Sequence, residues 1–568
     1  MNLTLLGRPT ELEKFSETSL LLRSQYSAAL AAEVAELEGV SARGSGCWSI
    51  KDSPRNWFSL DILTNGAVNG WSNRYSEKAR PKCEVVPVRN FEWCQKHDIR
   101  DNEGNIAKGV WSHQLEMITF DLTRLQDINA GEMGTGKTLA KFEAIEHLRY
   151  KLKLNKGPLW WVAPKSALTA LWTQMSKWKF YLQWGDRVFN YAQLEKEMDQ
   201  AKQPPQILVM DESQAVKRNQ SRRTQLAIQL GVECDRHWGE DSARYLMTGT
   251  PSPESHFDWW TQCEIVRPGW LREASYAKFE RRMATFGFED KPGGGSYPVF
   301  QDYKAAEVAK LPNRLSGLVQ IWWKKDCMDL PEKLYEVIEC QPDAATLRVA
   351  RLLTKRFSGA ELQQKLRQLS DGFQYVSQAV DDDTSEVVAE SEPARTTQVG
   401  LTPKDQVLRD LLEEYTPHKR FVVYAAYEAS VDRCVSIARE AGWKVWRYDG
   451  RGQEGGVTEE VFTDYRRNSE PICFVGNPEA AGAGLTLSGS PAICYYSNSF
   501  KGVYRTQSED RIHRPGATRE RGCKIYDIVH LPTDKLVIER VKAKRDAEVL
   551  TLQEIAAALG EGRDEEVR

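Results

Sequence analysis

The sequence predicts an α/β protein with two parallel-sheet lobes, helical insertions between them and a small N-terminal accessory domain. Residues 106–265 and residues 401–545 each alternate short apolar runs with helical patterns. That alternation is typical of βαβ units on a parallel sheet. The chain has 568 residues, which is more than one ordinary core holds, so several domains are expected.

Pattern changes along the chain divide it into five regions. These are an accessory domain (1–105), a first lobe (106–265), insertions with a linker and the end of the first lobe (266–400), a second lobe (401–545), and a C-terminal helix and tail (546–568). The acidic run at 381–392 is polar and poor in bulky groups, which predicts a mobile loop. In the accessory domain, Leu20 to Leu37 shows helical periodicity, and the alternation in residues 47–94 predicts small strands.

The composition limits the classes of protein that the chain can represent. Hydrophobic residues make up 41% and charged residues 28%, which is typical of a globular protein. The net charge is −3, so any contact with nucleic acid must depend on local basic patches. The sequence lacks a long apolar run and a secretory signal pattern, so we expect no membrane span and a cytoplasmic location.

A glycine-rich run in the first lobe predicts a phosphate-binding loop. Gly131 to Thr138 reads GEMGTGKT, which fits the pattern GxxxxGK[ST]. In such a loop the backbone amides face phosphate oxygens, the lysine reaches the β- and γ-phosphates, and the hydroxyl helps to hold Mg²⁺. A glycine-rich turn that binds no nucleotide is the alternative. The residues expected to contact ATP in this loop are Met133, Gly134, Thr135, Gly136, Lys137 and Thr138.

A buried strand that ends in two acids predicts the second half of the same site. Ile207 to Met210 is apolar and is followed by Asp211 and Glu212. Ligands bind at the carboxyl ends of strands in open α/β sheets. We therefore expect Asp211 to help hold Mg²⁺ and Glu212 to polarise the attacking water.

Further motifs follow these two in a fixed order, and together they resemble helicase superfamily 2, in detail the Swi/Snf-type DNA-dependent ATPases. The resemblance covers roughly residues 108–545. The segments that carry it besides the phosphate loop are WVAPKS (161–166), DESQ (211–214) with Lys217, Asn219 and Ser221, LMTGTP (246–251), WWKKDCMDLPEK (322–333), FVVYA (421–425), RYDG (447–450), AAGAGLTL (480–487) and QSEDRIHR (507–514).

The resemblance implies a fold of two RecA-like lobes and a role for several residues. Lys137, Thr138, Asp211 and Glu212 would form the catalytic half-site of the first lobe. Arg511 and Arg514 would bring positive charge to the γ-phosphate from the second lobe, so that hydrolysis depends on lobe closure. The remaining implied residues are Gln114 for adenine, Gly484 for ATP, and Thr248, Gly249, Thr250 and Gln507 for coupling hydrolysis to movement.

Basic residues near these motifs are candidates for contacts with the nucleic-acid backbone. They are Lys165, Ser166, Lys217, Arg218, Arg222, Arg223 and Arg447. A solvated charged face is the alternative for the cluster at 217–223. Contacts with phosphates position a motor without reading sequence, and they make affinity fall with salt. One departure from the family is the segment Asn477-Pro478-Glu479, which stands where the family often has Ser-Thr followed by a base. The acid Glu479 would be unfavourable beside a phosphate.

These observations lead to the expectation of an ATP- and Mg²⁺-dependent translocase on double-stranded or forked DNA. It would act as a monomer on DNA structures or bound proteins, with possible replication or repair partners at the nucleoid or in an infected host cytoplasm. The combination of Gly-Leu-Thr-Leu (484–487) with the last motif (507–514) resembles the annealing or fork-remodelling branch of the family. Residues 1–105 would select the DNA structure. The alternatives are a strand-separating DNA or RNA helicase and a nucleotide-dependent scaffold without turnover.

Overall fold

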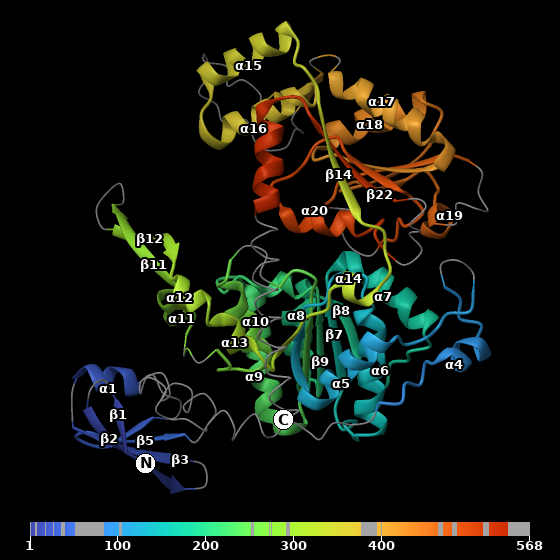
Figure 1. The fold of residues 1–568 in the computed structure, drawn as a ribbon. Helices are drawn as coiled ribbons and strands as arrows, with labels where there is room; N and C mark the ends of the chain where they lie inside the picture. The colour runs from blue at the N-terminus through green and yellow to red at the C-terminus, as the bar shows by residue number, and fades with distance from the viewer. Residues whose placement is uncertain are drawn as a thin grey trace.

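The fold is taken from a computed structural model, which describes most of the chain. The described residues are 2–5, 8–16, 19–25, 28–35, 40–51, 85–101, 105–251, 255–271, 273, 275–290, 296–376, 395–398, 400, 402–463, 470–479, 485–514 and 522–543. The acidic run at 381–392, Gly484 and the predicted C-terminal helix and tail lie outside these residues. Figure 1 shows two stacked lobes, with the N-terminal domain beside the lower one.

Among the described residues of the N-terminal domain, five strands form an antiparallel sheet in the order β1-β2-β3-β5-β4, accompanied by one helix. Its elements are β1 (Asn2–Leu5), β2 (Arg8–Ser16), β3 (Ser19–Ser24), α1 (Ala28–Ala35), β4 (Ser41–Gly44) and β5 (Cys47–Lys51). The helix predicted for Leu20 to Leu37 is therefore wrong in its first part. Leu20, Leu21 and Leu22 are buried in a strand that pairs on both sides, and only the alanine-rich part is helical.

Residues 85–101 pack on the first lobe, although the predicted boundary places them in the accessory domain. The Arg89 guanidinium is buried and pairs with Glu143 at 2.6 Å and Glu146 at 2.8 Å, both on α6 (Lys137–Tyr150). A buried arginine with two carboxylate partners anchors this segment, and the short helix α4 (Phe91–Lys96) follows it.

The first lobe is a six-stranded sheet in the order β13-β6-β10-β9-β7-β8, in which every pairing is parallel. Its further elements are α5 (Ser112–Arg124), β6 (Gln126–Asn129), β7 (Leu159–Ala163), α7 (Lys165–Lys177), β8 (Arg187–Asn190), α8 (Leu194–Gln200), β9 (Ile207–Asp211), α9 (Arg222–Trp238), β10 (Ala243–Met247), α10 (Asp258–Val266) and β13 (Val319–Gln320). The predicted strands before the phosphate loop and before Asp211 are confirmed as β6 and β9.

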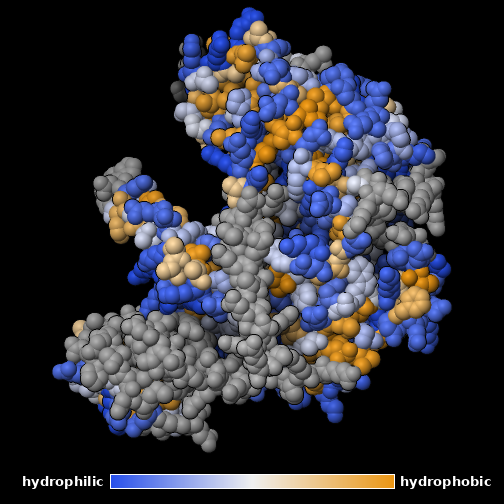
Figure 2. All heavy atoms as spheres, viewed as in Figure 1, coloured by the Kyte–Doolittle hydropathy of each residue, from blue (hydrophilic) through white to orange (hydrophobic). Residues whose placement is uncertain are grey.

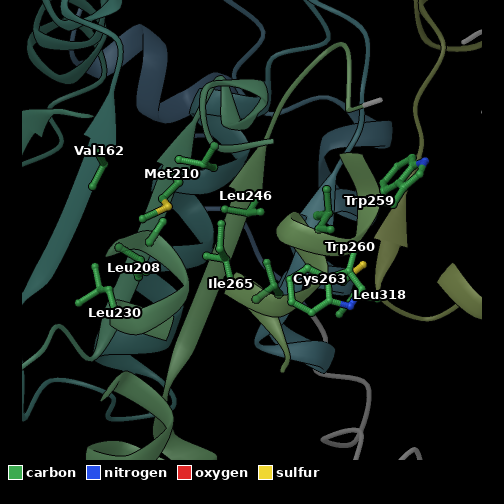
Figure 3. Close-up of a cluster of buried hydrophobic side chains, with 14 of the residues drawn as sticks. Val162, Leu208, Met210, Leu230, Leu246, Trp259, Trp260, Cys263, Ile265 and Leu318 are labelled. Atoms are coloured by element: carbon green, nitrogen blue, oxygen red, sulfur yellow. The ribbon is translucent and has the colours of Figure 1, made fainter. Parts of the chain in front are cut away.

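One apolar core of this lobe is formed by side chains of the strands and of several helices, among them α9 and α10. Figure 3 shows Val162, Leu208, Met210 and Leu246 of the sheet facing Leu230 of α9 and the α10 residues Trp259, Trp260, Cys263 and Ile265. Most of these side chains are almost fully buried, and each such burial contributes about 1.5–3 kcal/mol before entropy is counted. The packing fixes the carboxyl ends of the strands, where the predicted site residues lie.

A helical insertion with a hairpin follows α10. It consists of α11 (Tyr276–Met283), β11 (Ala284–Asp290), β12 (Ser296–Tyr303), α12 (Ala305–Val308) and α13 (Leu311–Leu315). The antiparallel hairpin β11–β12 stands away from the body of the lobe (Figures 1 and 2). The chain then completes the first sheet with β13 and passes through α14 (Lys324–Cys327) to the other lobe.

The second lobe is a seven-stranded sheet in the order β14-β22-β21-β17-β20-β18-β19, parallel except for the last pair. Its elements are β14 (Lys333–Glu339), α15 (Ala344–Arg356), α16 (Gly359–Ser370), α17 (Pro403–Tyr415), β17 (Arg420–Tyr424), α18 (Glu428–Glu440), β18 (Lys444–Asp449), β19 (Gly452–Glu454), α19 (Glu459–Thr463), β20 (Ile472–Gly476), β21 (Ala492–Tyr495), α20 (Gly502–Glu509) and β22 (Cys523–Val529). A separate pair is formed by β15 (Phe373–Val376) and β16 (Arg395–Gln398).

The predicted fold class of two RecA-like parallel-sheet lobes with insertions and an N-terminal accessory domain is confirmed. The second lobe begins before the expected 401–545, because β14 pairs with β22 from Lys333 onward. This strand lies at the sheet edge and is mostly exposed, so the sequence there lacks the continuous apolar run of a buried strand. Among the described residues, no helix combines the length and apolar character that a membrane span requires.

Candidate nucleotide site between the lobes

The predicted phosphate loop connects β6 to α6. Gly134 and Gly136 adopt φ angles of 88° and 82°, in the left-handed region that glycine enters without strain. Gly136 is the residue before the first turn of α6, so the loop ends at a helix N-terminus, where anions bind favourably. The Lys137 ammonium donates to the Gly131 carbonyl at 2.6 Å and to the Glu132 carbonyl at 3.1 Å. The loop is therefore folded as the sequence predicts.

Two carboxylates face this lysine from the end of β9. Burial and the adjacent Glu212 carboxylate raise the pKa of Asp211 to about 7, against the opposing effect of Lys137. Burial lowers the pKa of Lys137, while Glu212 and Asp211 oppose that shift. The three groups that sequence reasoning assigned to one site therefore act on one another electrostatically.

The donor set at this place fits ATP and a divalent cation. The helix N-terminus and Lys137 supply donors to phosphate oxygens, and the half-buried Thr138 hydroxyl follows directly. The adjacent carboxylates of Asp211 and Glu212 repel each other, so a nearby cation stabilises their charged forms. Their oxygen atoms are hard ligands of the kind that Mg²⁺ prefers. Of the residues present, Thr138 and Asp211 would hold the ion.

A chain of hydrogen bonds leads from the acids to the loop after β10. The Gln214 side-chain amide donates to the Glu212 carboxylate at 2.9 Å. The Thr248 hydroxyl donates to the side-chain oxygen Oε1 of Gln214 at 2.7 Å. The Thr248 hydroxyl in turn accepts from the Thr250 amide at 3.0 Å. These bonds join the predicted coupling residues directly to the predicted water-polarising acid.

The loop after β10 also packs against the phosphate loop. A β-carbon at Gly249 would lie 2.9 Å from the Met133 Cγ, so only glycine permits this close approach. Gln507, the fourth predicted coupling residue, is buried on α20 of the second lobe. Three of the four predicted coupling residues, Thr248, Gly249 and Thr250, therefore lie next to the phosphate loop within the first lobe. Gln507 belongs to the second lobe.

Both predicted arginines follow α20 and reach the first lobe. A β-carbon at Gly134 would lie 3.7 Å from the Arg514 Cγ, and Arg514 donates to the Thr486 hydroxyl at 2.9 Å. Burial and the neighbouring Arg511 lower the pKa of Arg514 to about 10, although Glu212 and two other carboxylates oppose the shift. Burial likewise lowers the pKa of Arg511. Arg514 thus faces the phosphate loop from the second lobe, while Arg511 donates to the Leu485 carbonyl at 3.2 Å and is influenced by the Glu212 charge.

Sequence reasoning missed a lysine at the boundary between the lobes. The Lys324 ammonium of α14 is buried and lies 2.8 Å from the Asp510 carboxylate, and it donates to the His513 carbonyl at 3.1 Å. The Lys324 amide donates to the Glu132 carboxylate of the phosphate loop. The segment WWKKDCMDLPEK pointed to this region, but it gave no reason to single out this lysine.

Gln114 lies against the phosphate loop and is almost fully buried. Its side-chain amide donates to the Gly136 carbonyl at 3.2 Å, and its carbonyl oxygen accepts from the Trp111 amide at 2.9 Å. Its predicted contact with adenine stays a prediction. Gly484, the other ATP-binding residue expected in the second lobe, is outside the described residues.

The basic cluster of the first lobe lines a surface groove of about 550 Å³. Lys217, Arg218, Arg222 and Arg223 all contribute to its walls. Arg222 pairs with Glu195 on the exposed surface, and the Arg223 guanidinium lies 5.8 Å from the Tyr191 ring centre. Lys165 and Ser166 are exposed at the start of α7.

Arg447 is placed differently from the other basic candidates. Its guanidinium lies within 3.1 Å of the Glu454 carboxylate and within 3.9 Å of Asp432 and Asp449. Glu479, whose acid was unexpected beside phosphate, is paired with Lys501 at 2.6 Å. The lysine therefore neutralises this acid locally.

Comparisons with known proteins agree with the motifs. The chain is 22% identical over 503 residues to transcription regulatory protein SNF2 of Saccharomyces cerevisiae, covering 81% of the chain and 28% of the yeast protein. It is 21% identical over 487 residues to the ISWI chromatin-remodeling complex ATPase ISW1 of the same yeast, covering 78% of the chain and 40% of the relative. No family model matches the chain.

A solved structure with the description "Sulfolobus solfataricus SWI2/SNF2 ATPase core in complex with dsDNA" covers 79% of this chain and 94% of its own, at 16% identity and a TM-score of 0.33. The predicted resemblance to helicase superfamily 2 is confirmed by the sequence relatives. Within that superfamily the chain is similar to the Swi/Snf-type ATPases, although it spans well under half the length of the two yeast proteins.

Proposed function

We propose that the chain is a DNA-dependent ATPase of the Swi/Snf type that moves on double-stranded or branched DNA. The observation that carries the proposal is the convergence of Lys137, Asp211 and Glu212 from one lobe with Arg511 and Arg514 from the other. Phosphoryl transfer needs positive charge around the γ-phosphate and an oriented water. Each lobe supplies only part of that arrangement.

The residues divide the work of hydrolysis between the two lobes. Lys137 and the amides of the phosphate loop bind and orient the phosphates, and Glu212 orients the attacking water. Mg²⁺, held by Thr138 and Asp211, would neutralise developing negative charge on the phosphates. Arg511 and Arg514 stabilise the charge that forms at the γ-phosphate.

Movement on DNA follows from this division. Turnover requires closed lobes, and release of the products removes the phosphate charge that attracts Arg511 and Arg514. The hydrogen-bond chain from Glu212 through Gln214 to Thr248 transmits the state of the nucleotide to the loop after β10. Alternate closing and opening is how a two-lobed ATPase converts hydrolysis into steps.

Similarity to chromatin-remodeling ATPases supports DNA as the track and DNA-bound protein as a target. The basic groove at Lys217 and Arg218 supports phosphate contacts on the first lobe. A contribution of residues 1–105 to the choice of DNA structure, a monomeric state, and a place in replication or repair are parts of the same proposal.

Steady-state ATP hydrolysis tests the proposal. It is measured without nucleic acid and with duplex DNA, forked DNA, single-stranded DNA and RNA, each at low and high salt. We expect stimulation by duplex or forked DNA that high salt removes, and loss of turnover in Lys137→Ala. Lys355→Ala, an exposed lysine on α15, is the matched control and should behave like the wild type. Stimulation only by single strands or RNA would favour a strand-separating helicase, and no turnover under any condition would overturn the proposal.

A further inference from the structure

A corner of the first lobe far from the nucleotide site combines exposed aromatic rings with lysines. It is formed by the loops before β7 and before β8, so it lies at the amino ends of the strands, whereas the nucleotide site lies at their carboxyl ends. We call it the aromatic–lysine corner, and its members are Tyr150, Lys151, Lys153, Lys179, Tyr181 and Trp184.

The aromatic rings of the corner are unusually exposed. Trp184 is 103% exposed, Tyr181 is 74% exposed and Tyr150 is 68% exposed. Large apolar side chains gathered on a surface mark an interaction site, because a lone chain gains nothing from leaving them in water. Lysines near helix ends have an ordinary explanation in the helix dipole, but the exposed rings do not.

The turn that carries these rings is firmly built. The Phe180 ring is buried and stacks on Phe142 at 4.5 Å. Asp186 accepts from the Gln183 amide at 2.7 Å, from the Leu159 amide at 2.8 Å and from the Arg149 guanidinium at 2.6 Å. The turn therefore fixes the backbone that carries Tyr181 and Trp184, so that less backbone has to be ordered on binding.

The two loops of the corner lie side by side. The Gln183 side chain donates to the Tyr150 hydroxyl at 3.3 Å, and a β-carbon at Gly185 would lie 3.8 Å from the Pro158 Cβ. The one carboxylate shown at their junction, Asp186, is already paired with Arg149. Within the described part of the chain, Lys151, Lys153 and Lys179 make no ion pair, so the corner carries uncompensated positive charge.

An exposed face of α7 joins this corner to the predicted nucleic-acid contacts. Lys165, Thr169, Trp172 and Ser176 are all exposed, and their spacing places them on one face of the helix. Lys165 begins α7 beside the predicted contact Ser166, and Lys179 lies just beyond its last turn. The helix spans about 20 Å, and the ring of Trp172, 47% exposed, lies midway along it.

We propose that the exposed face of α7 and the aromatic–lysine corner bind a single strand of nucleic acid that runs on from the predicted contacts at Lys165 and Ser166. Lysines attract the phosphates, and exposed rings stack on unpaired bases, which is the chemistry of single-strand binding surfaces. A duplex keeps its base faces covered, so it would leave Trp184 and Tyr181 without a partner. The proposal extends the proposed function, because it gives an unpaired strand a place on the same motor.

Binding of fluorescein-labelled oligothymidylate and oligouridylate to the full chain, followed by fluorescence anisotropy, tests the proposal. The two oligomers distinguish DNA from RNA as the source of the strand. The double variant Tyr181→Ala with Trp184→Ala should raise the Kd for at least one of them at least about tenfold. Phe288→Ala removes an exposed ring (74% exposed) from the hairpin β11–β12, and this control should bind like the wild type.

A second variant tests the charge separately. Replacing Lys151, Lys153 and Lys179 by Gln should lower the slope of log K against log salt by about 2, since each single-strand phosphate contact contributes about 0.7. Replacing the exposed Lys196, Lys202 and Lys355 by Gln is the matched control. Crosslinking of oligothymidylate that contains iododeoxyuridine should label a peptide with Tyr181 or Trp184.

The outcomes separate this inference from the proposed function. Unchanged oligomer binding in both corner variants overturns the inference, and duplex-stimulated hydrolysis would then still stand on its own. If the corner variants instead abolish self-association seen by light scattering and leave oligomer binding intact, the corner is a contact between copies and the inference is wrong. If the wild type shows no DNA-stimulated turnover, the proposed function fails, while weakened oligomer binding in the variants would still support the corner.

Discussion

Lys324 and Asp510 form a buried ion pair across the boundary between the two lobes, with 2.8 Å between the ammonium nitrogen and the carboxylate oxygen. Lys333 approaches the same carboxylate at 3.0 Å. Asp510 directly precedes Arg511, and the Lys324 amide is bonded to Glu132 of the phosphate loop. The pair therefore ties the arginine-bearing segment of one lobe to the nucleotide loop of the other.

This pair predicts a pH dependence of stability. Burial alone would raise the pKa of Asp510, but Lys324 and Lys333 outweigh it and hold that pKa well below its ordinary value. A carboxyl with a lowered pKa in the folded state stabilises the fold above the unfolded value of about 4, and that stabilisation is lost as the pH falls further. The free-energy difference between wild type and Asp510→Asn in urea unfolding should therefore shrink as the pH falls from about 4 to about 2, after staying constant above about pH 5. A constant difference over that range would contradict the assignment.

Replacing Arg514 by Ala should leave ATP binding nearly intact and reduce kcat by about 10³-fold or more, the range found for arginines that act on the γ-phosphate. The control is Arg356→Ala, an exposed arginine on α15, which should keep full turnover. Single-turnover hydrolysis together with binding of a fluorescent nucleotide separates the two effects. A large loss of nucleotide affinity with unchanged kcat would show that Arg514 serves binding instead.

Thr248→Val should uncouple hydrolysis from movement. The substitution keeps the shape of the side chain but removes the hydrogen bond to Gln214 and the one from the Thr250 amide. The net value of the bond to Gln214, about 1 kcal/mol, corresponds to about a fivefold change in an equilibrium. Displacement of a triplex-forming strand, counted per ATP hydrolysed, should fall by about that factor. Thr354→Val, at an exposed threonine of α15, is the control and should leave coupling unchanged. Equal losses of hydrolysis and displacement would argue against a coupling role.

The salt dependence of duplex binding should distinguish two predicted phosphate contacts. Arg218→Gln removes an exposed arginine of the groove and should lower the slope of log K against log salt by about 0.9. Arg447→Gln should change the slope little, because three carboxylates already surround this arginine. A larger change for Arg447 than for Arg218 would show that Arg447, and not Arg218, contacts the DNA phosphates.

A buried charge cluster should contribute strongly to the free energy of unfolding of the second lobe. The Lys404 ammonium is fully buried and lies 2.9 Å from Asp371 and 3.2 Å from Asp534. Lys404→Met leaves both carboxylates without their cation and should lower the free energy of unfolding by about 3–5 kcal/mol. Lys444→Met breaks an exposed pair with Glu470 and should cost less than about 1 kcal/mol. Urea denaturation followed by circular dichroism measures both, and equal losses would contradict the prediction.

Local patterns in the sequence predicted much of the fold and of the nucleotide site. The glycine run before Lys137 and the apolar strand before Asp211 are short, continuous signals, so β6, β9 and the lobes they belong to could be predicted. The strand β3 was missed because Leu20 to Leu22 form an apolar run that fits a helix as well as a buried strand. Lys324, the surroundings of Arg447 and the exposure of Trp184 depend on distant segments, and no pattern within one segment indicates them.

The passage from β13 to β14 has a consequence for kinetics. Val319 and Gln320 close the first sheet, and Lys333 already pairs in the second, so residues 321–332 form a short tether between the lobes. A short tether keeps its two ends at an effective concentration on the order of millimolar. Assembly of the arginines with the phosphate loop is thus first-order, and specific activity should not depend on protein dilution. A single proteolytic cut within 328–331 would turn this assembly into a bimolecular encounter between fragments.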